Sequence, residues 1–152
     1  MSSVLKIALA QVSARIGDCT YNANIVRAMR DEAAKQGADI LVLPELHISG
    51  YPPEDLVLNA SFQAECRAQI ELLAQETKSG PALLIGTPWV HEGALYNAVA
   101  FLNNEKIESL SFKCDLPNYG VFDEKRLFAA GPPPSPILFK GIKIGVPICE
   151  DI

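Results

Sequence analysis

The stretch Asp-Ile-Leu-Val-Leu-Pro-Glu at residues 39–45 decides the fold of this chain. It holds four consecutive apolar residues, two of them β-branched, and the run is ended by Pro44. Nearly continuous apolar runs of this kind are typical of strands that are covered on both faces of a sheet. We therefore predict a buried strand over residues 39–43, with Glu45 directly after its carboxyl end.

Amphipathic helices are predicted on both sides of this strand. Residues 20–36 carry mostly apolar side chains at helical spacing, and Gly37 suits the end of a helix. Residues 60–77 form the second predicted helix, with Asn59 or Ser61 as its cap. The side chains that set the inner faces are Ile25, Ala28, Met29, Glu32 and Ala33 in the first helix, and Ala64, Ile70, Leu73 and Ala74 in the second.

Further strands complete a layered sheet. They are predicted over residues 4–12, 82–86, 94–102, 106–111, 137–139 and 142–148. Asn103-Asn104 resembles the turn of a hairpin, and residues 112–136 are rich in Pro and Gly and are predicted to be loop. Because strand and helix alternate early and a meander follows, we predict an α/β fold with the helices packed on one side of the sheet.

Composition places the chain among folded globular proteins. Its 152 residues are 49% hydrophobic and its mean hydropathy is +0.14, which excludes a disordered chain. The net charge is −5 and the Lys and Arg residues are scattered, so we expect no nucleic-acid partner and no membrane binding. No apolar stretch approaches the roughly 20 residues of a membrane span, and the first residues lack a secretory pattern. We therefore expect a cytoplasmic protein.

The spacing of the four cysteines does not match a zinc site. Neither a C-x-x-C pair nor suitably placed histidines are present, so we predict no metal site. Without a secretory signal, reduced thiols are expected. Cys19, Cys66 and Cys114 are expected to be small buried hydrophobic side chains, whereas Cys149 is distinguished by its neighbours.

Three reactive side chains follow predicted strands. Glu45 and Lys113 each stand where an apolar run gives way to loop. Cys149 follows the run Lys-Ile-Gly-Val-Pro-Ile at 143–148 and precedes two carboxylates. Functional groups of open α/β sheets gather at the carboxyl ends of strands, so the three side chains converge if their strands are parallel neighbours. The chain ends three residues after Cys149, where a helix should begin, and we expect it to be a fragment.

The chemistry available to these groups is covalent acyl transfer. A thiol with a pKa of about 8.5 needs a base at neutral pH, and a carboxylate in an apolar pocket can be that base. An ammonium group and the backbone N–H after the nucleophile can stabilise an oxyanion. Such a site would attack an amide carbon, release ammonia and hydrolyse a thioester. His47 and His91 have no comparable strand-end position, so a histidine base is not expected.

Four segments carry a resemblance to a known family. They are Leu-Val-Leu-Pro-Glu-Leu at 41–46, Gly-Tyr-Pro-Pro-Glu-Asp-Leu at 50–56, Lys-Cys-Asp-Leu-Pro-Asn-Tyr-Gly-Val-Phe-Asp-Glu-Lys-Arg at 113–126 and Ile-Cys-Glu-Asp-Ile at 148–152. The chain resembles the nitrilase, or carbon–nitrogen hydrolase, superfamily over essentially its whole length. Within that superfamily it is most similar to the glutaminase domain of glutamine-dependent NAD+ synthetases, for which Leu-Pro-Asn-Tyr-Gly-Val-Phe-Asp-Glu is a specific motif.

The resemblance implies a role for each matching residue. Cys149 would be the nucleophile, Glu45 the general base, and Lys113 the cation that stabilises the tetrahedral intermediate. Glu124 matches a second glutamate beside this triad. The positions implied to line the glutamine pocket are Tyr51, Tyr119, Phe122 and Glu150. For the two tyrosines, ordinary packing in a loop is the alternative interpretation.

The family fold is an αββα sandwich, of which this chain would form the N-terminal half. Residues 1–152 would be the N-terminal part of the glutaminase domain, with the rest of that domain and a synthetase domain absent. The full enzyme would use ATP and Mg2+ to amidate nicotinate adenine dinucleotide with ammonia from glutamine. The chain has no Gly-rich phosphate loop, so no cofactor is expected in it. Its implied partners are glutamine, the synthetase domain and further copies in a homo-oligomer.

Two alternatives remain open from the sequence. One is a different amidase of the same superfamily, acting on a free amide, a carbamoyl group or a nitrile. The other is an inactive truncated chain, because the missing half would leave apolar surface uncovered and weaken the activity of these 152 residues alone.

Overall fold

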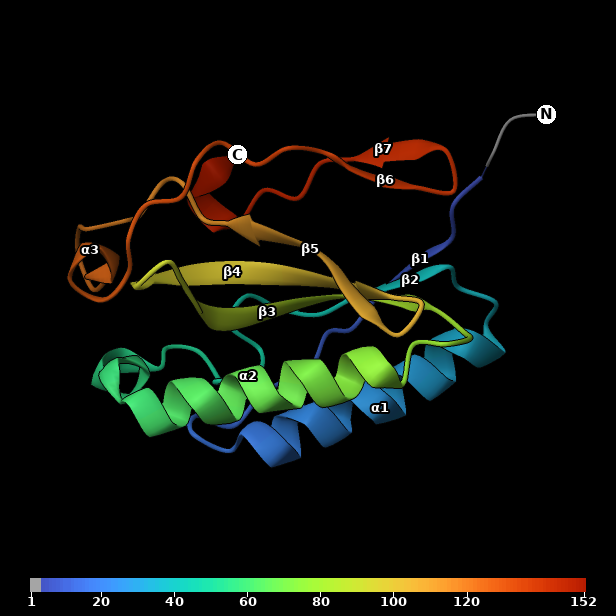
Figure 1. The fold of residues 1–152 in the computed structure, drawn as a ribbon, viewed down its shortest axis with the longest axis horizontal. Coiled ribbons are helices and arrows are strands. Elements are labelled where there is room, and N and C mark those ends of the chain that lie inside the picture. Colours follow the sequence, from blue (N-terminus) through green and yellow to red (C-terminus); the bar gives the residue numbers. More distant parts are fainter. Residues whose placement is uncertain (1–3) are drawn as a thin grey trace.

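A five-stranded sheet forms the centre of the computed structural model, which describes residues 4–152 (Figure 1). Its strands, in spatial order, are β1 (Ile7–Leu9), β2 (Ile40–Val42), β3 (Ala82–His91), β4 (Ala94–Asn103) and β5 (Lys106–Phe112). The first three strands pair in parallel, and β3, β4 and β5 form an antiparallel meander. Strand β5 therefore runs in the same direction as β2, and both strands end at the same edge of the sheet.

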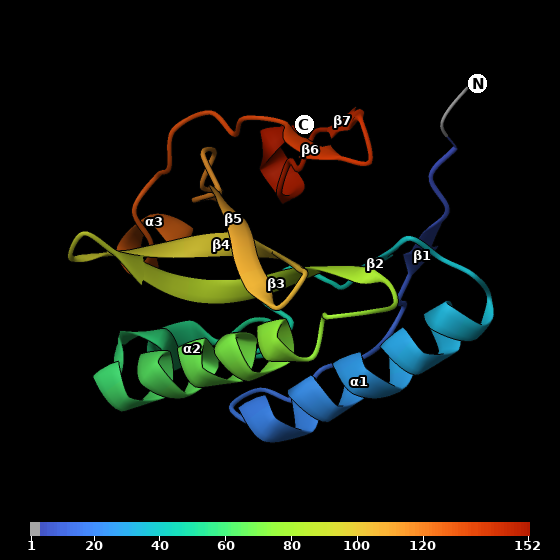
Figure 2. The same cartoon turned by 45° about the vertical axis from the view of Figure 1, so that its right-hand side comes forward.

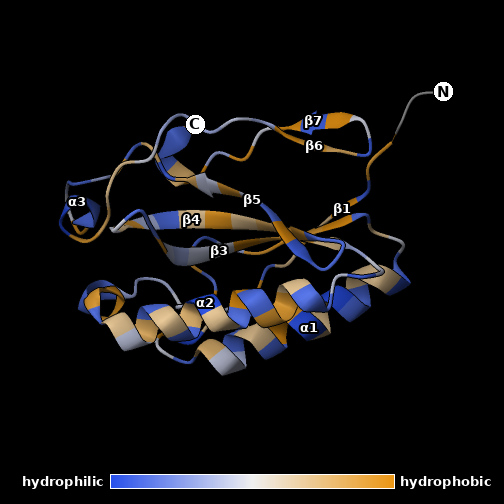
Figure 3. Ribbon diagram, in the orientation of Figure 1, coloured by the Kyte–Doolittle hydropathy of each residue, from blue (hydrophilic) through white to orange (hydrophobic). Residues whose placement is uncertain are grey.

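Two helices cover one face of this sheet, as predicted (Figures 1 and 2). They are α1 (Cys19–Lys35) and α2 (Ala60–Gln75). Each begins at a side chain that accepts backbone N–H bonds: Asp18 accepts from Tyr21 at 3.0 Å, and Asn59 accepts from Ser61 at 2.9 Å. Figure 3 shows apolar residues along the strands and a mixture of polar and apolar residues along both helices. The main core is formed by buried apolar side chains of the helices and of the sheet.

The buried faces of the helices differ in phase from the prediction. In α1 the buried side chains include Asn22, Ala23, Val26 and Ala33, whereas Ala28 and Glu32 are exposed. The reason is that a polar residue occupies the inner face: the buried amide of Asn22 donates to the carbonyls of Arg15 and Ile48. In α2 the predicted Ala64 is exposed, and the inner face consists of Phe62, Cys66, Ile70, Leu73 and Ala74.

A second, two-stranded sheet lies on the other face of the main sheet. Strands β6 (Ile137–Phe139) and β7 (Ile142–Ile144) pair antiparallel, and Phe139 packs edge-on against Phe101 with 5.6 Å between ring centroids. This small sheet covers Ile40 and Leu84 as well. The α/β class is thus confirmed, with one helix layer, the main sheet and a second sheet on its opposite face.

Several predicted boundaries are wrong for identifiable reasons. The predicted strand 142–148 ends at Ile144, because Gly145 to Ile148 has no strand partner. The hairpin turn lies at Asn104–Glu105, both with positive φ, because Asn103 still pairs with Lys106. The strand predicted over 82–86 continues to His91, since β4 pairs with its whole length.

Three shorter elements complete the chain. They are the 3-10 helices η1 (Glu54–Leu58) and η2 (Cys149–Asp151), and the single turn α3 (Glu124–Leu127), which lies inside the segment predicted to be loop. The first predicted strand, over residues 4–12, is reduced to Ile7–Leu9. Across residues 4–152, none of the helices has the length and apolar character needed to cross a membrane.

Candidate functional site

Glu45 and Lys113 meet at one edge of the sheet, although their strands are not neighbours. Glu45 follows β2 and Lys113 follows β5, and strands β3 and β4 lie between them. The prediction that both residues stand after strand ends is right. Their strands are not the parallel neighbours on which the predicted convergence is conditional, yet Glu45 and Lys113 still meet. The residues meet because β2 and β5 point the same way and the segment after β2 crosses over β3, which brings Glu45 toward the end of β5.

The centre of the site is a buried ammonium group between two carboxylates. Lys113 Nζ lies 2.8 Å from Glu45 Oε1 and 2.9 Å from Glu124 Oε1. The side chain of Lys113 is 0% exposed, that of Glu124 is 8% exposed, and that of Glu45 is 21% exposed. A buried charge is tolerated only when it is paired, so these three side chains form one unit.

Burial and pairing move the pKa values of this unit in different ways. Burial alone would lower the pKa of Lys113, but the hydrogen bonds to Glu45 and Glu124 more than offset it and raise that pKa. The pKa of Glu124 is also raised, because burial outweighs the hydrogen bond and charge of Lys113. Lys113 is therefore held in its charged form, while Glu124 is biased toward its neutral form.

A glycine in β3 makes room for the backbone around Glu45. A Cβ atom at Gly86 would lie 2.3 Å from the backbone nitrogen of Leu46 and 2.4 Å from the carbonyl oxygen of Pro44. The segment after β2 therefore passes directly over β3, where Ile48 donates its N–H to the Gly86 carbonyl at 3.1 Å. Sequence reasoning missed Gly86, although an isolated glycine in a strand is a known sign of close backbone approach.

Cys149 opens the turn η2 rather than ending a strand. The residue is exposed, with φ of +51°, and an ordinary side chain rarely adopts that backbone conformation. Asp151 ties this turn to the chain just after Lys113: its carboxylate accepts N–H bonds from Cys114 at 3.0 Å, Asp115 at 2.8 Å and Ile148 at 3.1 Å. Figure 1 shows the C-terminal turn beside the end of β5. Asp151 was also missed by sequence reasoning.

The thiol of Cys149 responds electrostatically to the buried unit. Burial raises the pKa of this thiol, and the charge of Glu45 raises it further. The Lys113 ammonium and the backbone N–H of Glu150 oppose the increase. The raised pKa favours the protonated thiol, which needs a base to react.

The four residues predicted to line a substrate pocket fall into two cavities. Tyr119 and Glu150 line a cavity of about 730 Å³, and the hydroxyl of Tyr119 donates to the carboxylate of Glu150. Tyr51 and Phe122 line a cavity of about 50 Å³ together with Glu124. The two cavities adjoin, because the Tyr119 and Phe122 rings pack edge to face with 5.6 Å between centroids.

Tyr51 lines the small cavity together with Glu124. Burial raises the pKa of its hydroxyl, and the negative charges of Glu45 and Glu124 raise that pKa further. Tyr51 is 42% exposed, so it is accessible to a bound molecule. Tyr51 and Glu124 therefore line the same cavity, next to the ion pairs of Lys113.

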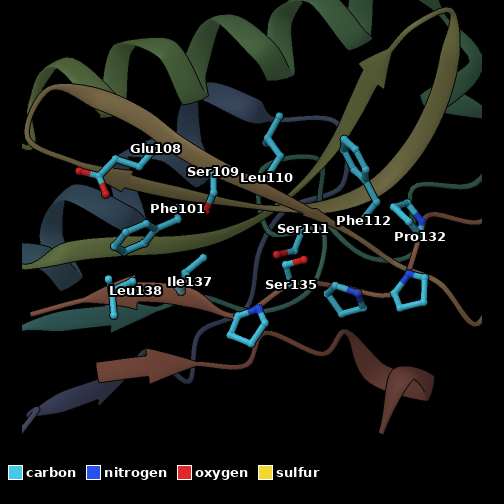
Figure 4. A pocket seen from close by; sticks show the side chains of 13 residues that line it. Phe101, Glu108, Ser109, Leu110, Ser111, Phe112, Pro132, Ser135, Ile137 and Leu138 are labelled. Atoms are coloured by element: carbon cyan, nitrogen blue, oxygen red, sulfur yellow. The ribbon is translucent and has the colours of Figure 1, made fainter. Parts of the chain in front are cut away.

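A separate cavity of about 440 Å³ lies along β5 (Figure 4). It is lined by residues of that strand, including Ser109 and Phe112, and by the proline-rich segment 132–136. None of the predicted site residues lines it, so it is distinct from the site around Lys113.

One group of side chains has the composition of a metal site. Among residues 4–152, the ligand atoms of Cys114, Asp115 and Asp151 lie within 4.8 Å of one another. Both carboxylate oxygens of Asp151 already accept backbone N–H bonds. This group therefore has a structural explanation as the tie between two segments.

The chain is similar to known proteins over nearly its whole length. Residues 6–152 match the carbon-nitrogen hydrolase family. The chain is 41% identical to the glutamine-dependent NAD(+) synthetase of Xylella fastidiosa over 155 residues, an alignment that covers 100% of this chain. The same alignment covers only 28% of that relative, so the chain spans about a quarter of its length.

Solved structures agree with this similarity. The glutamine-dependent NAD+ synthetase of Acinetobacter baumannii matches with a TM-score of 0.90 and 35% identity, over 96% of this chain and 28% of that chain. An amidase from Nesterenkonia sp. AN1, in a mutant form with acrylamide added at its active-site cysteine, matches with a TM-score of 0.73 and 25% identity. That match covers 92% of this chain and 55% of the amidase chain.

Proposed function

The chain belongs to the carbon–nitrogen hydrolase family, and from this premise we propose that it is the glutaminase part of a glutamine-dependent NAD+ synthetase. Its reaction is hydrolysis of the glutamine side-chain amide. The observation that carries the proposal is the fully buried Lys113 ammonium, paired with Glu45 and Glu124 beside an exposed cysteine.

The first step forms a thioester. The Cys149 thiol loses its proton to Glu45: the S–H bond breaks, an O–H bond forms on the carboxylate, and the electron pair stays on sulfur. Sulfur then attacks the amide carbon, and the carbonyl oxygen becomes an oxyanion. Lys113 and the backbone N–H of Glu150 stabilise that oxyanion. Glu45 returns its proton to the amide nitrogen, the C–N bond breaks, and ammonia leaves.

The second step regenerates the thiol. Water attacks the thioester carbon and gives a proton to Glu45, the C–S bond breaks, and the sulfur recovers the proton. The products are glutamate and ammonia, and no oxidant or reductant is required. Glu124 holds Lys113 in place throughout, and the residues proposed to contact the substrate are Tyr51, Tyr119, Phe122 and Glu150.

The remainder of the proposed enzyme lies outside this chain. Residues 1–152 are then the N-terminal part of the glutaminase domain, and the ammonia serves an ATP- and Mg2+-dependent synthetase domain that amidates nicotinate adenine dinucleotide. The length of the relatives supports this division, since the chain covers 28% of the Xylella protein. Assembly into a homo-oligomer and a cytoplasmic location belong to the same proposal.

Cys149→Ala in the full-length natural protein tests the function. We expect glutamine-driven NAD+ formation to be abolished and ammonia-driven formation to be retained, because the change removes only the source of nitrogen. Cys114→Ala, which removes the neighbouring free thiol, is the matched control and should retain both activities. Equal loss of both activities in Cys149→Ala would contradict the proposal. Hydrolysis of other amides with glutamine inert would favour a different amidase of the family.

A further inference from the structure

Asn97 contacts both partners of the proposed chemistry, although the mechanism above assigns it no role. It lies in β4, between the strands that lead to Glu45 and Lys113, and is 1% exposed. Its side-chain Nδ2 donates to Glu45 Oε1 at 2.7 Å. Its backbone carbonyl accepts the N–H of Lys113 at 2.8 Å. One residue therefore sets the position of the carboxylate relative to the chain that carries the ammonium group.

The two oxygens of the Glu45 carboxylate have different surroundings. Oε1 accepts hydrogen bonds from both Asn97 and Lys113. Within residues 4–152, Oε2 accepts no hydrogen bond from another side chain or from the backbone. Hydrogen bonds to a carboxylate oxygen stabilise its negative charge and make it less available to a proton. Oε2 is therefore the oxygen with lone pairs free to accept one.

The orientation of the Asn97 amide is determined by Glu45. Its Oδ1 atom is buried without a hydrogen-bond partner among the described residues. If the amide were turned over, that oxygen would face the negative Oε1 atom at hydrogen-bond distance, which is repulsive. A buried polar atom without a partner is uncommon in folded proteins and calls for an explanation. Donation to Glu45 provides that explanation.

We propose that Asn97 is a positioning residue, which with Lys113 holds Oε1 of Glu45 so that Oε2 takes the proton from the Cys149 thiol. The proposal rests on the assignment of Glu45 as the base in the proposed function. In this step the S–H bond breaks and an O–H bond forms on Oε2, while the electron pair remains on sulfur. Without Asn97 only Lys113 holds Oε1, so the carboxylate can rotate about its last bond and the position of Oε2 is no longer fixed.

Alkylation of Cys149 by iodoacetamide in the full-length natural protein tests this proposal without glutamine. The rate is followed between pH 5 and 9 by mass spectrometry of the Cys149 peptide. Asn97→Leu removes the donor at similar volume, and we expect alkylation at pH 7 to slow by about 10- to 100-fold. The pH profile should change as well. In the unchanged protein, assistance by Glu45 should keep the alkylation rate nearly level near neutral pH, whereas in Asn97→Leu the rate should rise with pH as for an unassisted thiol.

Asn103→Leu is the matched control. Asn103 lies at the far end of the same strand, and its Nδ2 also donates to a carboxylate, that of Glu108, at 2.9 Å. That pair is exposed and distant from the site along the strand, so alkylation of Cys149 should stay within about 2-fold of the unchanged protein. If alkylation of Cys149 slows as much in Asn103→Leu as in Asn97→Leu, the proposal is overturned, because the effect would then follow from damage to β4.

A double substitution separates positioning from packing. In a Glu45→Gln background, Asn97→Leu should slow alkylation by no more than about 2-fold, because the carboxylate that it positions is absent. Equal slowing in both backgrounds overturns the proposal. If Asn97→Leu does not fold, the side-chain amide signals of Asn97 are compared by NMR in the unchanged and Glu45→Gln proteins. If the chemical shifts of the Asn97 side-chain amide are the same in the two proteins, the proposal is also overturned. Failure of glutamine hydrolysis itself would leave these results standing and would count only against the proposed function.

Discussion

Two clusters in this molecule place one cation between two carboxylates, and they differ in burial. The buried cluster consists of Lys113, Glu45 and Glu124, and the exposed cluster consists of Arg126, Asp55 and Asp123. The cation is 0% exposed in the buried cluster and 45% exposed in the exposed cluster. Exposed ion pairs contribute little, because water and salt screen them, whereas a buried charge without its partner is costly. The same charge pattern therefore ties η1 to α3 in one place and forms a candidate active site in the other.

The largest effect is expected from removal of the buried cation. Lys113→Met leaves the buried carboxyl group of Glu124 and the half-buried one of Glu45 without their partner. We expect the free energy of unfolding to fall by about 3–5 kcal/mol, with loss of glutamine hydrolysis. Arg126→Met is the control, with no measurable change in stability expected. Urea denaturation of both variants measures the difference. Equal losses in the two variants would remove the distinction between the clusters.

A carboxylate of the buried cluster should matter for activity more than for stability. Glu45→Gln keeps the shape of the side chain but removes the proposed base, so glutamine hydrolysis should fall by about 10²- to 10⁴-fold. Asp55→Asn makes the same chemical change in the exposed cluster and should leave hydrolysis unchanged. Steady-state kinetics of both variants check this expectation. Normal turnover in Glu45→Gln would move the role of base to Glu124.

The smallest effect is a pH dependence of stability that comes from Glu124. Burial raises its pKa in the folded protein, more than the bond to Lys113 lowers it. The folded state thus binds this proton more tightly than the unfolded state does. The contribution to stability is complete below the unfolded pKa of about 4.3 and is lost as pH rises through the folded pKa. Between the unfolded and the folded pKa of Glu124, the free energy of unfolding changes by at most about 1.4 kcal/mol per pH unit, because one proton is involved.

Glu124→Gln removes that titration and provides the measurement. The free energy of unfolding is compared between the unchanged protein and the variant from pH 4 to 8. The stability of the unchanged protein relative to the variant should decrease as pH rises. A relative stability that increases over this range would show that the bond to Lys113, not burial, controls the titration of Glu124.

Local sequence patterns predict the parts of this site that follow the ends of apolar runs. The run at 39–43 predicts the buried strand and places Glu45 after it, and the same logic locates Lys113 after β5. Both predictions succeed because a strand and the residue that follows it are adjacent in the chain. The α/β class follows from the same alternation of strands and helices.

The missed residues depend on pairing between distant segments. Asn97 and Gly86 lie in the middle of strands, and their roles appear only when β3 and β4 are placed beside the segment after β2. The prediction that Cys149 ends a strand is wrong because residues 145–148 pair with no strand. The phase of α1 was misread because Asn22, a polar residue, is buried by hydrogen bonds to two loops.

Labelling with a glutamine-like electrophile tests the central claim most directly. The full-length natural protein is treated with the reagent in the presence and absence of glutamine, and the modified peptide is identified by mass spectrometry. We predict one adduct, on Cys149, whose formation is slowed by glutamine and by Glu45→Gln, while Cys19, Cys66 and Cys114 stay unmodified. No adduct on Cys149, or labelling that glutamine does not slow, would contradict the assignment of this site to glutamine hydrolysis.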